Sequence, residues 1–267
     1  MTGAHRHSFI PAMATAYDEA ATAWSLGASV VYERLADEVV ALMPRSTGGT
    51  VLDLCAGTGA ATTALLRRHQ PVIAVDVSHA MLAVGSHARP PGVAADALAL
   101  PFRAAAFAGV IVNCGLNHAP DPVAFLREAG RVTQPGGAVL ASTFTGGWAH
   151  PAKAAVDGVL MTFGYRAPSW HQQFKSEIEP ASSAPEQLIA LSERAGLAER
   201  SVTRLDVVVD LSIEQMVAWR FAMASHAAFV SGLSEDARRR VTQLATTAVR
   251  DCWEPLVIPL LVFSGTA

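Results

Sequence analysis

A glycine-rich segment near residue 57 is the first part of this chain whose residues could do chemistry. The apolar run 50–55 reads Thr-Val-Leu-Asp-Leu-Cys, and Gly57 and Gly59 follow it in the sequence Ala-Gly-Thr-Gly. Glycine lets the backbone approach a ligand closely, and the helix expected next presents free N–H groups in its first turn. Asp76 ends the next apolar run, 19 residues after Gly57, where its carboxylate could accept hydrogen bonds from ribose hydroxyls. The pattern predicts a ribose-containing ligand, with NAD among the candidates.

Two residues favour a sulfonium ligand over a dinucleotide. Thr62 stands where the dinucleotide fingerprint has its third glycine or alanine. Asp53 lies four residues before Gly57, where a carboxylate would repel a pyrophosphate. The same carboxylate could help to hold the ammonium group of S-adenosylmethionine, directly or through water. We therefore expect S-adenosylmethionine rather than NAD.

Five segments in order resemble the motifs of class I S-adenosylmethionine-dependent methyltransferases. Residues 51–59 resemble the first motif, 74–82 the second and 95–102 the third. Residues 113–121 resemble the segment after the fourth strand. Residues 127–137 resemble the turn into the fifth strand in the ubiquinone and menaquinone type of small-molecule methyltransferase. The resemblance covers roughly residues 50–145.

The resemblance implies a cofactor, S-adenosyl-L-methionine, and a product, S-adenosyl-L-homocysteine. In the third motif, Asp96 is expected to meet the adenine amine. Cys55 departs from the family, because it replaces the first motif glycine, and it would be strained if the turn required a positive φ. The residues expected to bind the cofactor are Asp53, Cys55, Ala56, Gly57, Gly59, Asp76, Val77, Met81, Asp96, Ala97, Asn113 and His118.

Four residues are candidates for catalysis. Tyr17 belongs to a Tyr-Asp pair that resembles one found before the first motif in this subgroup, and we expect it to close over the cofactor methyl. His118 follows the fourth strand and is the best candidate for a general base. His150 and His171 lie in a later segment from which they could reach the acceptor. For each residue, a purely structural role is the alternative.

Alternating strands and helices must position these residues. A helix is expected over 12–43, and short strands and helices then alternate up to residue 144, which predicts a parallel sheet covered on both faces. With the resemblance, the expected fold class is α/β. It is a Rossmann-like, doubly wound, seven-stranded and mostly parallel sheet with a final antiparallel strand and helical lid insertions.

The chain is expected to form a single methyltransferase domain over 1–267. Within it, 1–47 would be an N-terminal helical lid segment and 48–144 the cofactor-binding core. Residues 145–180 show no clear period and, with 212–253, are expected to cap the substrate. Six aromatic residues of these caps suit an apolar or aromatic acceptor: Trp148, Phe163, Trp170, Phe174, Trp219 and Phe221.

Composition excludes several other classes. The net charge is −3 and the longest basic run is three arginines, so no nucleic-acid partner is expected. No apolar stretch reaches about 18 residues, so no membrane span is expected. No signal peptide is apparent, which makes the cytoplasm the default location. The three cysteines are too widely spaced for a zinc site or a disulfide framework, so no metal is expected, and a homodimer stays open.

The sequence therefore predicts methyl transfer from S-adenosylmethionine to a small apolar or aromatic metabolite, with O-methylation ahead of C- or N-methylation, in biosynthesis or secondary metabolism. Residues 113–116 lack the Asn/Asp-Pro-Pro-aromatic sequence that methylation of base amino groups often uses. The alternative is a cofactor-binding protein of the same fold that catalyses a non-methylating cyclisation or acts as a binding module. An NAD-dependent dehydrogenase ranks third.

Overall fold

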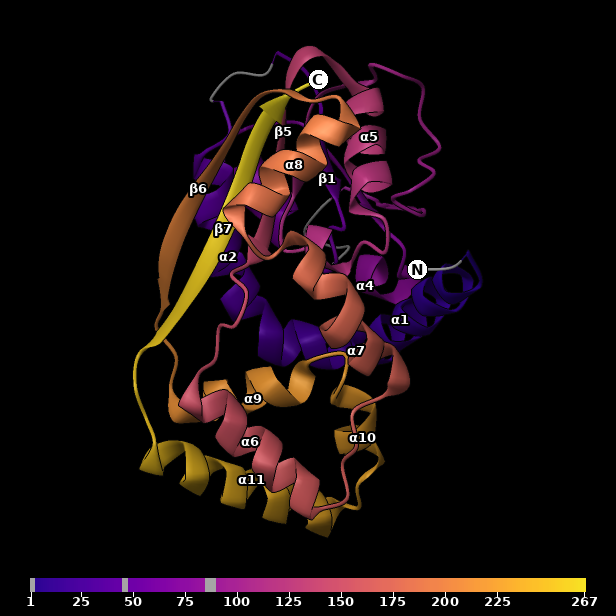
Figure 1. Ribbon diagram of the computed structural model, residues 1–267. Helices are drawn as coiled ribbons and strands as arrows, with labels where there is room; N and C mark the ends of the chain where they lie inside the picture. Colours follow the sequence, from indigo (N-terminus) through magenta and orange to yellow (C-terminus); the bar gives the residue numbers. More distant parts are fainter. Residues whose placement is uncertain (1–2, 45–47, 85–89) are drawn as a thin grey trace.

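A seven-stranded sheet forms the centre of the protein (Figure 1). The computed structural model describes residues 3–44, 48–84 and 90–267. The sheet order is β3-β2-β1-β4-β5-β7-β6. All adjacent pairs from β3 to β5 are parallel, and β7 runs antiparallel to both of its neighbours. The strands are β1 Val51–Leu54, β2 Val72–Asp76, β3 Val93–Ala94, β4 Phe107–Val112, β5 Thr133–Phe144, β6 Ala198–Val209 and β7 Leu256–Thr266. The predicted fold class is confirmed.

Helices cover both faces of this sheet, as its apolar strands require. Ile111 of β4 packs in the same cluster as α2 and α3, whereas its neighbours Val110 and Val112 pack with α5 and α8. This alternation follows from the two-residue period of a strand. The core helices are α2 Ser29–Ala41, α3 Ala60–Arg67, α4 His79–Ala83, α5 Pro122–Val132 and α8 Pro185–Ala195.

The N-terminal region is two helices rather than the single predicted helix over 12–43. Helix α1 (Gly3–Ala23) and helix α2 are joined by a π-helical turn, Trp24–Ala28. A Cβ on Gly27 would lie 2.6 Å from the carbonyl oxygen of Ala218 in helix α9 (Ile213–Ala222), so the backbones approach closely there. The irregular turn thus coincides with a tight helix crossing, a long-range contact that helical periodicity does not reveal.

Residues 145–180, which show no clear period in the sequence, are largely helical, in agreement with the predicted helical lid insertions. Helix α6 (Pro151–Thr162) begins with a proline at its first position, and Ala152, Val156 and Leu160 form a buried stripe. The stripe packs in one cluster with residues of helix α11 (Glu235–Asp251). Helix α7 (Ser169–Gln173) and the short turns Phe174–Ile178 and Glu179–Ser182 follow.

The lid consists of these helices together with α9 (Ile213–Ala222), α10 (Ala227–Gly232) and α11 (Glu235–Asp251). In Figure 1, α6, α9 and α11 lie below the sheet, beyond the end of β6 and β7, and α7 and α10 lie between them and α1. The predicted cap segment 212–253 is confirmed as helical, although residues 223–226 interrupt it. No helix in the described ranges is long and apolar enough to cross a bilayer.

Candidate functional site

The glycine-rich turn joins the end of β1 to helix α3. Gly57 has a φ of 54° and Gly59 a φ of 97°, both in the left-handed region that favours glycine. Gly59 is the residue before the first turn of α3. Thr62 in that turn donates a 2.6 Å hydrogen bond to Asp53 Oδ2, and Asp53 is fully buried. Thr62, which broke the dinucleotide fingerprint, therefore holds the carboxylate beneath the turn.

Two cysteines adopt the left-handed backbone that usually requires glycine. Cys55 has a φ of 60° after β1, and Cys114 has a φ of 56° after β4. Cys55 therefore has the positive φ for which strain was expected, and this conformation costs on the order of 1–2 kcal/mol. A Cβ on Gly115 would lie 2.6 Å from Cys55 Cβ, so the two turns press together. Strands β1 and β4 are neighbours at which the strand order reverses, which is where ligands bind in open α/β sheets.

Asp76 connects the turn to the following segment. Its Oδ2 accepts a 2.8 Å hydrogen bond from the Gly57 N–H, and its Oδ1 accepts one of 2.8 Å from the Ser78 N–H. Burial raises the pKa of the carboxyl, while these backbone N–H groups act in the opposite direction. Each carboxylate oxygen can accept more than one hydrogen bond, so both can still receive a ribose hydroxyl.

Two adjoining pockets surround Asp76. The first, here called the glycine-turn pocket, is lined by Gly57, Met81 and Asn113 among others. The second, here called the Asp96 pocket, is lined mainly by apolar residues from Ile10 to Phe125, with Asp96 and Asp76 as its carboxylates. Asp96 Oδ1 accepts a 2.9 Å hydrogen bond from the Leu98 N–H. An apolar slot with a carboxylate at its edge can hold a planar base that carries an amino group.

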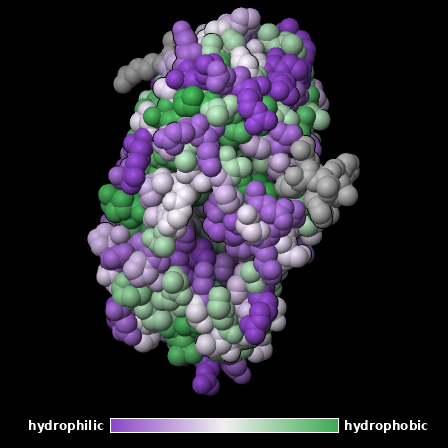
Figure 2. Space-filling model, in the orientation of Figure 1, coloured by the Kyte–Doolittle hydropathy of each residue, from purple (hydrophilic) through white to green (hydrophobic). Residues whose placement is uncertain are grey.

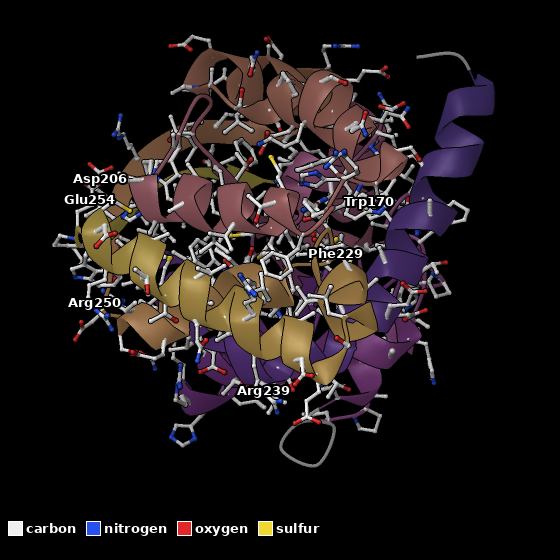
Figure 3. The ribbon with its side chains drawn as sticks, turned by 90° about the horizontal axis from the view of Figure 1, so that it is seen from below. Trp170, Asp206, Phe229, Arg239, Arg250 and Glu254 are labelled. Carbon is white, nitrogen blue, oxygen red and sulfur yellow. The ribbon has the colours of Figure 1, made fainter. Side chains whose placement is uncertain are left out.

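A third cavity, here called the lid pocket, opens between the sheet and the lid helices and has a volume of about 520 Å³. Small-molecule sites typically range over about 300–1,000 Å³. Its aromatic lining includes Trp148, Trp170, Phe174 and Trp219. Figure 2 shows this face of the molecule hollowed near its middle, with hydrophilic residues at the opening. Figure 3, seen from the lid end, shows Trp170 beside helix α1.

Tyr17 and His118 lie where the pockets meet. His118 lines all three pockets, and Tyr17 lines both the glycine-turn pocket and the lid pocket. The Tyr17 hydroxyl is 3.3 Å from His118 Nε2, and the His118 ring stacks on Phe174 with 4.4 Å between centroids. His118 Nδ1 is buried without a hydrogen-bond partner among the described residues.

Both members of this pair are neutral at pH 7. Burial, with smaller effects from His171 and Lys175, lowers the pKa of His118 to about 3. Burial raises the pKa of the Tyr17 phenol well above its usual value, and the Asp76 charge adds to the shift. Tyr17 therefore remains a hydrogen-bond donor, and His118 remains an uncharged imidazole.

Asp18 anchors the helix that carries Tyr17, a role that the sequence reasoning missed. Its Oδ1 accepts hydrogen bonds from the Ser78 hydroxyl, at 2.6 Å, and from the Ala80 N–H, at 2.9 Å. Ser78 also caps helix α4 by accepting a hydrogen bond from the Met81 N–H. The Tyr-Asp pair thus combines a side chain in the pocket with a side chain that fixes α1 to the segment after β2.

The structure brings most of the predicted residues together. The glycine-turn pocket is lined by Asp53, Cys55, Ala56, Gly57, Asp76, Val77, Met81, Asn113, Tyr17 and His118. Asp96 and Ala97 line the Asp96 pocket, and His171 lines the lid pocket. Burial lowers the pKa of His171 to about 4.

Four predicted residues lie outside the three pockets. Gly59 shapes the turn but does not line a pocket. His150, a predicted catalytic residue, instead caps α6 through Nδ1, which accepts a hydrogen bond from the Ala152 N–H. Phe221 lines a separate groove on the outside of α9, and Phe163 packs against the main core. Lining residues that the sequence reasoning missed include Tyr32, Asn117, Lys153, Asp157 and Arg220, because tertiary packing alone places them there.

Among the described residues, no group of three or more His, Cys, Asp or Glu side chains is arranged to hold a metal ion. The residues do fit S-adenosylmethionine. The turn is open above Gly57, where a Cβ would meet only Met81 Cε, at 3.4 Å. The site also offers a carboxylate for ribose and an apolar slot for adenine.

Comparison with known proteins agrees with this geometry. The model of a family described as a methyltransferase domain matches residues 52–141. A demethylmenaquinone methyltransferase of Mycobacterium sp. (strain KMS) is 33% identical over 194 residues, which cover 72% of this chain and 81% of that protein. The enzyme of the same name from Mycolicibacterium gilvum is 38% identical over 138 residues, which cover 52% of this chain and 59% of the relative. That match thus spans little more than half of the relative's length.

Solved structures share the fold. A chain of the Haloferax volcanii complex between the Trm112 methyltransferase activator and a methyltransferase has a TM-score of 0.57 and 19% identity, covering 94% of this chain and 97% of that chain. The (4+2) cyclase SpnF has a TM-score of 0.54 and 18% identity, covering 88% of this chain and 80% of that chain. At these identities the likeness describes architecture only.

Proposed function

Because the chain belongs to the S-adenosylmethionine-dependent methyltransferases that resemble the menaquinone type, we propose that it methylates a small aromatic acceptor held in the lid pocket. The meeting of the three pockets at His118, with Tyr17 lining two of them, carries this proposal. A cofactor bound against the glycine turn would present its methyl group at this junction, opposite an acceptor that enters beneath the lid. The aromatic lining of the lid pocket supports an aromatic acceptor.

The cofactor is held, in this proposal, by residues at the ends of β1, β2 and β3. Asp76 accepts hydrogen bonds from the ribose hydroxyls, and the Asp96 pocket takes the adenine. Asp53, fixed by Thr62, provides negative charge for the ammonium group. When bound, S-adenosylmethionine supplies a methyl group that its sulfonium has already activated. The protein has then mainly to align the acceptor and exclude water.

Tyr17 and His118 orient the nucleophile. The Tyr17 phenol donates a hydrogen bond, and the neutral imidazole of His118 can pair with an acceptor hydroxyl. A pKa of about 3 makes His118 a weak general base at neutral pH, since a base works best with a pKa near the operating pH. We therefore assign His118 to positioning rather than to proton storage. The polar atoms at the junction, the Tyr17 hydroxyl and His118 Nε2, favour an oxygen nucleophile over a carbon one.

A turnover assay tests this function. Purified protein is incubated with S-adenosylmethionine and a panel of phenols, naphthols and naphthoquinols, and S-adenosylhomocysteine is measured by mass spectrometry. We expect acceptor-dependent product, and ¹³C-methyl cofactor with NMR then distinguishes O–CH₃ from C–CH₃. Tyr17→Phe and His118→Ala should each lower turnover by roughly tenfold or more, the scale of one transition-state hydrogen bond. Asp206→Asn, on the exposed edge strand β6, is the control that should leave turnover unchanged.

The alternative activities give different results. A protein that binds S-adenosylhomocysteine tightly but transfers no methyl group to any acceptor class would refute the proposed methyl transfer. A calorimetric titration that shows binding of NAD but no binding of S-adenosylhomocysteine would also refute S-adenosylmethionine as the cofactor.

A further inference from the structure

The charged residues of the lid pocket are unevenly paired. Among the described lining residues, five are charged: Lys153, Asp157, Lys175, Glu179 and Arg220. Arg220 Nη2 lies 2.7 Å from Asp157 Oδ1 and 2.9 Å from Oδ2, and Lys175 forms an ion pair with Glu179. Within the described ranges, no carboxylate lies within 4.0 Å of the Lys153 ammonium. Among these five residues, Lys153 is therefore the one whose charge has no counter-charge within ion-pair distance.

Lys153 is held inside the pocket. Its ammonium lies 3.9 Å from the centre of the Trp148 ring, in a cation–π contact. Burial lowers the pKa of Lys153 to about 8, and the positive charges of Arg220 and Lys175 also lower it. The negative charges of Asp157 and Glu179 raise it. The ammonium is still mostly protonated at pH 7, so an anion entering the pocket would find a partly desolvated positive charge.

Two further donors in this pocket lack acceptors. Trp219 is 3% exposed and Arg220 is 8% exposed, yet Trp219 Nε1 and Arg220 Nε have no hydrogen-bond partner in the described part of the chain. An unpaired buried donor costs about 1–3 kcal/mol. Both side chains come from consecutive positions of α9 and line the lid pocket with Lys153. Both N–H groups are enclosed by protein, so the Lys153 ammonium is the group that can meet an anion in the lid pocket.

The Arg220 side chain is fixed by a network that also prevents Asp157 from serving Lys153. His226 Nε2 lies 3.3 Å from Asp157 Oδ1, and His226 Nδ1 lies 2.9 Å from the Ser225 hydroxyl. Burial raises the pKa of the Asp157 carboxyl, but the hydrogen bond from His226 and the positive charge of Arg220 lower it to about 2. Asp157 is thus an ionised anchor for Arg220 and His226, which pre-organises the guanidinium.

We propose that the methyl acceptor carries an anionic oxygen group, such as a carboxylate, which binds the Lys153 ammonium in the lid pocket. This inference rests on the proposed function and narrows its acceptor class to aromatic acids. The anion pairs with this ammonium, while the nucleophile of the same molecule faces Tyr17 and His118. A purely apolar ring would leave the ammonium without a counter-charge, and the pocket would discriminate against it.

A matched pair of probes tests this inference without turnover. 2-Naphthoate and 2-naphthamide have the same ring and differ in charge. Each is titrated calorimetrically into the full-length protein saturated with S-adenosylhomocysteine, at pH 7. We expect naphthoate to bind at least about tenfold more tightly, since charge-assisted hydrogen bonds contribute about 1.5–3 kcal/mol. Lys153→Met should bring the two affinities within about twofold of each other, and Lys153→Arg should retain the preference.

Arg250→Met is the charge-matched control, because Figure 3 shows Arg250 at the outer end of α11, directed away from the lid interior. This variant should keep the full preference for naphthoate. Equal affinity of the wild-type protein for both probes would overturn the inference, as would a preference that persists in Lys153→Met.

Failure of the inference can be told apart from failure of the proposed function. Turnover of neutral phenols without any preference for naphthoate would leave methyl transfer standing and remove the anion site. Preference for naphthoate that depends on Lys153, without methyl transfer to any acceptor, would support the anion site and remove the proposed activity.

Discussion

Replacement of Asp76 by asparagine is the sharpest test of how the protein holds its cofactor. In the structure the two carboxylate oxygens accept hydrogen bonds from the backbone N–H groups of Gly57 and Ser78, each at 2.8 Å. Asparagine keeps one acceptor oxygen and turns an NH₂ group towards the second N–H. The substitution therefore removes both the charge that would bind ribose and one of the contacts that hold the glycine turn.

The expected loss of affinity follows from these contacts. A hydrogen bond to a charged group contributes about 1.5–3 kcal/mol, so Asp76→Asn should weaken S-adenosylhomocysteine binding by roughly 10- to 150-fold. Burial raises the pKa of this carboxyl, which means that the native charge is itself costly to bury. The substitution relieves that cost, so ligand affinity, rather than thermal stability, is the measure.

Isothermal titration calorimetry with S-adenosylhomocysteine gives the comparison. Asp206→Asn provides the same chemical change on an exposed strand and should bind like the wild type. Circular dichroism establishes that both variants are folded. An Asp76→Asn protein that is folded and binds the ligand within twofold of the wild type would refute the assignment of Asp76 to the ribose.

Four more predictions follow from the site. Asp18→Ala should weaken S-adenosylhomocysteine binding by about fivefold, because α1 loses its hydrogen bonds to Ser78 and Ala80 and such capping interactions contribute about 1 kcal/mol. Glu19→Ala is the control in the same calorimetric titration. Cys55→Gly should keep this affinity within about twofold, because glycine adopts a positive φ without strain, and a larger loss would argue for a thiol contact. Gly115→Ala should lower the free energy of unfolding, measured with denaturant, by about 1–3 kcal/mol. Adding Cys55→Gly should restore part of this stability, and a double variant as unstable as Gly115→Ala would contradict the close packing of the two turns. His118 has a folded pKa of about 3, below the 6.5 of an unperturbed histidine, so the unfolded chain binds more protons between these values and stability is lost as the pH falls below 6.5. The free energy of unfolding should fall by about 1 kcal/mol per pH unit in the wild type and by less in His118→Gln. Identical profiles of melting temperature against pH for the wild type and His118→Gln would contradict the burial of this histidine.

The cofactor half of the site was predictable because its residues are close together in sequence. Asp76 ends β2, and Gly57 and Asp96 lie within three residues of the ends of β1 and β3. Parallel strands bring their carboxyl ends to one edge of the sheet. The apolar runs that form β1, β2 and β4 are buried on both faces, so their pattern alone indicated the sheet.

The acceptor half was not predictable, because tertiary contacts assemble it. Lys153 and Asp157 lie in a segment without an obvious period, and Arg220 reaches them from a helix about 60 residues later. His150 was attractive as a histidine in a cap segment, but its ring caps the helix that it precedes. Sequence distance and residue type cannot distinguish a histidine that caps a helix from one that lines a pocket.

The central claim is that cofactor and acceptor meet at Tyr17 and His118, and a crystal structure of the protein with S-adenosylhomocysteine tests it most directly. We predict adenine in the Asp96 pocket, ribose on Asp76 and the sulfur atom facing the Tyr17–His118 pair across from the lid pocket. Ligand density elsewhere on the protein, or a sulfur atom turned away from this pair, would contradict the account.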